Sequence, residues 1–130
     1  MTNAINIGKL IYGTLINNEQ ISSLVGIKVF PLIAENETTF PFITYSRLNV
    51  ANSLETKDAF VIDEVQFNIQ VADNNYERSC EIANLVRGAF ENKIISNNEL
   101  QIKRIRMTNI SELYNEDTYV QSITFSCTAE

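Results

Sequence analysis

The side chains that could do chemistry in this chain are carboxylates, two cysteines and a short basic cluster, because the sequence contains no histidine. Without histidine, the Ser-His-Asp and Cys-His arrangements of nucleophilic catalysis and the commonest general base are excluded. The chain also lacks the glycine-rich phosphate-binding loops and the CxxC motif. We therefore predict that the protein is not an enzyme and that it binds no cofactor.

Carboxylates are the most numerous candidate ligands, and six of them stand near predicted turns or strand ends. They are Asp58, Asp63, Glu64, Asp73, Glu116 and Asp117. Their spacing matches no calcium-binding loop. We interpret them as solvated side chains of turns and strand edges, and we predict no metal site.

One basic cluster and two cysteines are the remaining candidates. Lys103, Arg104 and Arg106 could contact DNA, but a solvated strand face or salt bridges to an acidic neighbouring subunit explain the cluster more simply. Cys80 and Cys127 fall at apolar positions and are too few for a disulfide scaffold. We predict that both are buried free thiols.

The composition is that of an ordinary globular domain, with 45% hydrophobic and 20% charged residues. At 130 residues the chain is predicted to fold as one domain, residues 1–130. A net charge of −6 disfavours general nucleic-acid binding, because phosphate contacts draw on an excess of lysine and arginine. We see no signal-peptide pattern and no apolar run near the ~20 residues of a membrane-spanning helix. We therefore expect a soluble intracellular protein without membrane contact.

The elements that must position these side chains are organised around a predicted strand over residues 61–72. Its apolar side chains alternate with Glu64, Gln66, Asn68 and Gln70. Successive side chains of a strand point to opposite faces, so this alternation predicts one buried and one polar face.

A predicted helix over residues 76–94 follows that strand. Asn74 is the predicted N-cap, with Glu77 three residues later in a capping-box-like arrangement. Apolar residues recur at helical spacing, so one broad face is expected to pack on the sheet. The residues of this face are Tyr76, Cys80, Ile82, Ala83, Leu85, Val86, Ala89, Phe90 and Ile94.

The remaining elements complete a predicted α+β fold. A first helix begins near Ala4, and a short second helix is capped by Asn18 and ended by Gly26. Strands follow over residues 27–30 and 42–50. After the central strand and helix, strands are predicted over residues 100–110, with a β-bulge near Lys103 and Arg104, and over residues 119–128, after a turn at 112–117. The order predicts a mainly antiparallel β-sheet with helices covering one face.

The central strand is long for a domain of this size. Twelve residues of strand span about 40 Å, whereas a compact chain of this length has a diameter of about 35 Å. The hairpin of residues 42–50 and 61–72 should therefore bend strongly or project beyond the globule. The predicted subunit or partner interface consists of Glu55, Lys57, Asp58, Glu64, Gln66, Asn68 and Gln70.

Four segments, taken in order, match the pattern of one protein family. The first runs from Ile11-Tyr12 through Val25-Gly26 to Val29-Phe30-Pro31, and the second is Phe-Pro-Phe-Ile-Thr-Tyr at residues 40–45. The third is residues 65–72 with the helix that follows, and the fourth is residues 115–119 with the strand that follows. With these segments the chain resembles the phage tail completion proteins, the head–tail joining or tail-terminator-like proteins of long-tailed phages and prophages. Family members often carry a tryptophan near the end of the central strand, which this chain lacks.

The resemblance implies a non-enzymatic assembly protein that completes or terminates the tail and joins it to the head connector. It implies an α+β subunit in a ring, with six copies as the expected number. The implied partners are other copies of the chain, the tail-tube protein and the head connector or stopper protein. The implied location is the host cytoplasm during assembly and then the tail–head junction of the virion. The residues alone leave open a second interpretation, a small cytoplasmic protein-binding or dimeric regulatory α+β domain.

Overall fold

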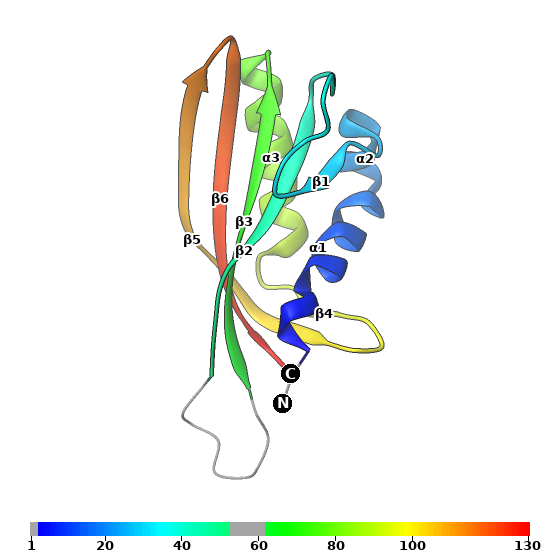
Figure 1. The fold of residues 1–130 in the computed structure, drawn as a ribbon, viewed down its shortest axis with the longest axis vertical. Helices are drawn as coiled ribbons and strands as arrows, with labels where there is room; N and C mark the ends of the chain where they lie inside the picture. The colour runs from blue at the N-terminus through cyan, green and yellow to red at the C-terminus, as the bar shows by residue number, and fades with distance from the viewer. Residues whose placement is uncertain (1–2, 53–61) are drawn as a thin grey trace.

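The computed structural model describes residues 3–52 and 62–130, and its elements follow the predicted order (Figure 1). The helices are the 3-10 helix η1 (Ala4–Asn6) and the α-helices α1 (Ile7–Ile16), α2 (Glu19–Val25) and α3 (Tyr76–Phe90). The strands are β1 (Val29–Pro31), β2 (Phe42–Asn52), β3 (Asp63–Asp73), β4 (Ile95–Ser96), β5 (Gln101–Asn115) and β6 (Thr118–Ala129). The predicted α+β class is confirmed, and η1 and the two-residue strand β4 are additions to it.

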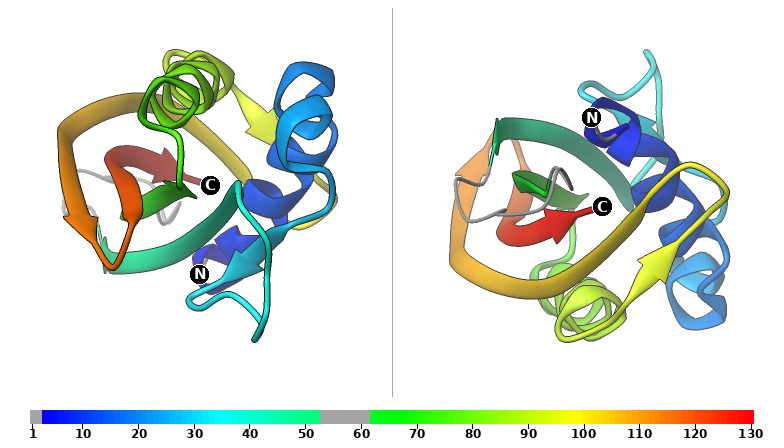
Figure 2. Two further views of the ribbon diagram at one scale, coloured as in Figure 1. Left: turned by 90° about the horizontal axis from the view of Figure 1, so that it is seen from above. Right: turned by 90° about the horizontal axis from the view of Figure 1, so that it is seen from below.

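The strands form one sheet in the order β1-β2-β3-β6-β5-β4. Every neighbouring pair is antiparallel except β1 and β2, which are parallel. Helix α3 packs on β3 and β6, while α1 packs on β1 and β2. Figure 2 shows these helices gathered on one side of the strongly twisted strands. No helix of the described residues covers the opposite face of the sheet.

The centre of the core is a cluster of three phenylalanines between β3, α3 and β6. The ring of Phe67 lies 5.5 Å from that of Phe90 and 5.2 Å from that of Phe125, measured between centroids. All three side chains are fully buried, as are Val65, Ile69 and Val71 on the same phase of β3. The alternation predicted for the inner face of the central strand is therefore confirmed.

The caps of the helices are partly as predicted. The Asn18 side chain accepts the Ile21 N–H at 3.1 Å, and Gly26 has a φ of +63° just after α2, both as expected. The N-cap of α3, however, is Asn75 and not Asn74, because the Asn75 side chain accepts the Arg78 N–H at 2.9 Å.

The buried face of α3 differs from the predicted one. The helix ends at Phe90 and not at residue 94, and Ile94 is 67% exposed. Cys80 is only half-buried and Tyr76 is exposed. The fully buried positions of α3 are Ser79, Ile82, Val86 and Phe90. Ser79 is tolerated at the centre of this face because its hydroxyl donates to the Tyr76 carbonyl oxygen at 2.6 Å.

Strand β5 is longer and more irregular than predicted. Its register shifts between Lys103 and Arg106, and Arg104 has a φ of +54°, so the predicted bulge is confirmed. A second shift lies between Met107 and Asn109. Pairing with β6 continues to Asn115, so the turn predicted at residues 112–117 is confined to Glu116 and Asp117, both of which have positive φ.

The long strands bend, as their length requires. Strand β2 contains a register shift between Arg47 and Asn49, and bulges increase local twist. The strands overlap in the view of Figure 1 where the sheet twists, and β2 and β3 continue past the helices to one end of the molecule. No helix in the described residues is long and apolar enough to cross a membrane.

Candidate subunit interface

The polar phase of β3 lies on the sheet face that the helices leave open. Glu64, Gln66 and Gln70 are exposed there, as predicted. Their neighbours across the ladder are the small polar residues Thr128, Ser126, Ser122 and Thr44. The face along β3 and β6 is therefore rich in hydroxyl and amide groups and carries few charges.

Asn68, also predicted for the interface, lies on this face as the alternation requires, but it is only 9% exposed. Its amide nitrogen lies 2.9 Å from Ser122 Oγ, 3.2 Å from the Ile123 carbonyl oxygen and 3.1 Å from Thr124 Oγ1. An amide has two donors to satisfy, and β6 supplies the acceptors. Asn68 thus joins β3 to β6 within the subunit. The other predicted contacts, Glu55, Lys57 and Asp58, lie outside the described residues.

Two long strand edges are open, at opposite margins of the sheet. In the described part of the chain, β1 pairs with β2 only at residues 43–45, so residues 46–52 of β2 have no strand beyond them. Likewise β4 pairs with β5 only at residues 101–102, and the Asn92 N–H donates a hydrogen bond to the Ile105 carbonyl oxygen. Residues 106–115 of β5 therefore have an open edge among the described residues. Unpaired strand edges recruit further strands.

Exposed apolar side chains mark both edges. Leu48 is 53% exposed and Val50 is 37% exposed on β2, while Leu113 is 63% exposed and Ile110 is 43% exposed on β5. The composition of each strand gave no sign of this, because which strands lie at the margins depends on pairing between distant segments.

A groove runs beside the open edge of β2. Its volume is about 440 Å³, and its walls include Ile5, Arg47, Leu48, Asn49 and Val50. The Arg47 Nη1 donates to the Ile5 carbonyl oxygen at 2.6 Å, which ties the strand to η1 on one side of the groove. The groove combines the apolar side chains of Ile5, Leu48 and Val50 with an open backbone, two features that suit the binding of an extended segment by strand addition.

A cluster of tyrosines surrounds Glu112 near the opposite end of β5. The Tyr119 ring centroid lies 5.3 Å from that of Tyr76 and 4.8 Å from that of Tyr114. The Tyr76 hydroxyl donates to Glu112 Oε2 at 2.9 Å, and Gln121 Nε2 donates to the same oxygen at 3.1 Å. Hydrogen bonding to Glu112 and, second, to Cys80 raises the pKa of Tyr76 to about 12. The sequence analysis missed this cluster because Tyr76 and Glu112 are 36 residues apart.

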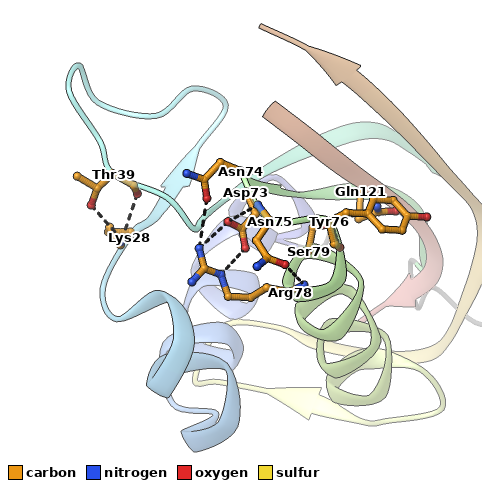
Figure 3. Close-up of polar contacts among 9 residues, drawn as sticks. All are labelled: Lys28, Thr39, Asp73, Asn74, Asn75, Tyr76, Arg78, Ser79 and Gln121. Carbon is orange, nitrogen blue, oxygen red and sulfur yellow. Dashed lines mark hydrogen bonds and ion pairs between the residues drawn. The ribbon is translucent and has the colours of Figure 1, made fainter. Parts of the chain in front are cut away.

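The junction from β3 to α3 is fixed by an ion pair (Figure 3). Asp73 is fully buried, and the Arg78 guanidinium donates to it through Nε at 2.6 Å and Nη2 at 2.7 Å. Burial by itself would raise the pKa of Asp73, but the hydrogen bonds from Arg78 and the Asn75 N–H, with the guanidinium charge, outweigh it and lower the pKa. Asp73 is thus a structural carboxylate that holds α3 against the sheet.

Of the candidate carboxylate ligands, Asp58 lies outside the described residues. Within residues 3–52 and 62–130, no group of three or more metal-ligating side chains lies close enough to hold an ion. Lys103 pairs with Glu130 of its own chain at 2.9 Å, while Arg104 and Arg106 are exposed on β5. Burial raises the pKa of the Cys127 thiol to about 12. The open sheet face and the two strand edges offer surfaces for contact with other molecules.

The fold and these surfaces define a class of protein, an α+β subunit whose helices cover one face of a sheet with open margins. A family model described as "Tail completion protein gp17" matches residues 9–129. The chain therefore belongs to the tail completion protein gp17 family, and it is a structural tail protein of the phage type.

Solved structures agree with this assignment at the level of the fold. A chain in the structure titled "Virion of native gene transfer agent (GTA) particle" is similar with a TM-score of 0.84 at 14% identity, covering 98% of this chain and 96% of that chain. A second solved structure is similar with a TM-score of 0.58 at 13% identity, covering 79% of each chain. Comparison with functionally curated proteins finds no match.

Proposed function

We propose that this protein completes the phage tail and joins it to the head connector, acting as a ring of identical subunits. The observation that carries the proposal, beside the family, is the position of the two open edges at opposite margins of one sheet. A contact is heterologous when one surface of a subunit meets a different surface of the next copy. Repeated heterologous contacts close into a ring when the rotation between neighbouring copies divides a full turn evenly. Six copies are the expected number.

The similar chain in the gene transfer agent structure supports this proposal, because that structure is of a virion particle. By analogy, the protein would be made in the host cytoplasm and would end at the tail–head junction of a virion. Its proposed partners are further copies of itself, the tail-tube protein and the head connector or stopper protein. We propose neither an enzymatic role nor specific binding to nucleic acid.

The open sheet face supplies the proposed contacts with the tail-tube and connector proteins, whereas the strand edges supply those between copies. Glu64, Gln66 and Gln70 are exposed on it. The two glutamines are uncharged and can form hydrogen bonds without desolvating a charge, whereas Glu64 needs a donor in the partner to offset that cost. Asn68 supports the face through its bonds to β6. The proposed contribution of residues 55, 57 and 58 rests on their sequence alone.

Deletion of the gene from its phage or prophage tests the proposal. Electron microscopy of the lysate should show filled heads separate from tails, and a plasmid copy of the gene should restore joined particles. A plasmid copy with Gln66→Arg and Gln70→Arg should fail to restore joining while folding normally by circular dichroism. Joined particles in normal numbers without the gene would overturn the proposal and favour a small binding or regulatory protein instead.

A further inference from the structure

The two open edges have matching strand polarity. Four long strands, β2, β3, β6 and β5, separate the two margins, and all three neighbouring pairs among them are antiparallel. An even number of antiparallel strands leaves the two outer strands running in opposite directions. Subunits related by rotation about a ring axis would therefore bring β2 of one copy antiparallel to β5 of the next.

The backbone groups of the two edges also point outward in compatible positions. Ile43 and Tyr45 direct their backbone groups toward β1, since the Ile43 N–H bonds to Lys28 and the Tyr45 carbonyl oxygen accepts from Leu32. By alternation, the backbone N–H and C=O groups of Arg47 also point away from β3. After the bulge, those of Val50 do so as well.

The same alternation can be followed across the sheet to β5. Tyr45, Ile69, Ile123 and Ile110 lie directly opposite one another along one row. Backbone bonds in such a row alternate from one pair of strands to the next. Ile110, and Glu112 two residues later, therefore direct their N–H and C=O groups away from β6.

From these observations we infer that adjacent copies join by adding β5 of one copy to β2 of the next, with Val50 opposite Ile110 and Arg47 opposite Glu112. The inference rests on the proposed ring and names the contact that builds it. Val50 and Ile110 both lie on the helix-covered side of the sheet, in the rows of Val65 and Ile123. The pairing buries two exposed apolar side chains against each other, beside the groove that Ile5 lines.

Charge supports the same register. With Val50 opposite Ile110, the extra residue of the β2 bulge brings Arg47 opposite Glu112 on the same face. Both side chains are exposed in the subunit. Opposite charges directly across an antiparallel pair stabilise it, whereas like charges destabilise it.

The register also has the stagger that a closed barrel needs. Val50 lies in the row of Cys127 and Ile110 in the row of Ile123, so each copy is offset by four residues of β6 relative to the next. Divided over the four long strands of a copy, the offset is one residue per strand. An eight-stranded barrel with a shear of about eight has the same ratio of shear to strand number, and its strands tilt by about 36°. If the pairing of β2 with β5 were shifted by two residues in the direction that halves the offset, the strands would tilt by only about 20° from the ring axis. The usual tilt of barrel strands is about 35–45°.

Cysteine cross-linking of the full-length protein assembled on isolated tails tests this contact. One chain carries Val50→Cys and a second carries Ile110→Cys, each in a Cys80→Ser background, since Cys80 is the more exposed natural thiol. A hydrogen-bonded antiparallel pair places Cα atoms about 5.5 Å apart, which suits a disulfide. We expect disulfide-linked dimers when the two chains are mixed, and a ladder of multimers when one chain carries both substitutions.

The controls separate this contact from other arrangements. Each single variant assembled alone should give no dimer, because the contact is heterologous. Ala51→Cys mixed with Ile110→Cys should link at least tenfold less, because Ala51 lies on the opposite face. Efficient linking of Val50→Cys to itself, or an Ala51→Cys yield equal to that of Val50→Cys, would overturn the register.

Light scattering of the same samples before oxidation distinguishes the failure of this inference from the failure of the proposed function. Multimers on the tail that do not cross-link at these positions would refute the β2–β5 contact and leave the ring standing. Failure of the natural protein to bind tails at all would refute both.

Discussion

Replacement of Phe67 by alanine is the most informative perturbation of the core. Its side chain is fully buried and contacts the rings of Phe90 and Phe125 at centroid distances of 5.5 Å and 5.2 Å. Truncation of a buried phenylalanine costs about 3–5 kcal/mol. Each favourable ring pair adds about 0.5–1.5 kcal/mol beyond the buried area. We therefore expect a loss in the upper part of that range, a large share of the ~5–15 kcal/mol that stabilises a typical domain.

Urea unfolding followed by far-ultraviolet circular dichroism measures this loss, since the chain has no tryptophan to report by fluorescence. The midpoint should fall while the dependence of the unfolding free energy on urea concentration stays the same. Leu48→Ala is the matched control, because Leu48 is 53% exposed on β2 and its truncation should change stability by no more than about 0.5 kcal/mol. A loss below about 1 kcal/mol for Phe67→Ala would mean that the helix-covered face of β3 has been assigned incorrectly.

Three further substitutions test the local contacts. Arg78→Ala should destabilise the protein by about 1–3 kcal/mol at neutral pH by leaving the buried Asp73 carboxylate without its ion pair. Because the pKa of Asp73 is lowered in the folded state, its contribution is present above the ordinary carboxyl pKa and is lost as the pH falls below it. Urea unfolding at neutral and acidic pH should therefore show a smaller cost in acid, and an equal cost at both would contradict this account. Asn18→Ala should cost about 1 kcal/mol of thermal stability by removing the cap of α2, whereas no change would mean that the cap contributes nothing. Glu112→Gln should lower the pKa of Tyr76 below about 12, because it removes the largest of the causes that raise it, while Cys80 remains. A spectrophotometric tyrosine titration, assigned with Tyr76→Phe, measures this, and an unchanged titration would exclude Glu112 as a cause.

Local patterns in the sequence were sufficient to predict most of the elements of this fold. Strict alternation along β3 identified the residues that fill the core, because a strand with one buried face has a period of two. The break in the alternation of β5 identified the bulge at Lys103 and Arg104. The cap of α3 was placed one residue early because Asn74 and Asn75 are chemically alike, and only the backbone geometry distinguishes them.

The surfaces of the candidate interface could be predicted only in part. The exposed positions of Glu64, Gln66 and Gln70 followed from alternation, but the burial of Asn68 depends on hydroxyl groups of β6 that lie more than 50 residues away. The open edges of β2 and β5 depend on the order of strands in the sheet, which no local pattern contains. Long-range pairing therefore marks the limit of the sequence analysis.

Several copies of this chain are proposed to assemble together on a phage tail. Light scattering of the purified protein, alone and mixed with the tail-tube protein, tests this proposal most directly. The chain has a mass of 14.8 kDa, and the account predicts that the mixture contains a complex in which several copies are bound to the tube. A mixture in which the protein stays separate from the tube, or binds it as a single copy, would contradict the account.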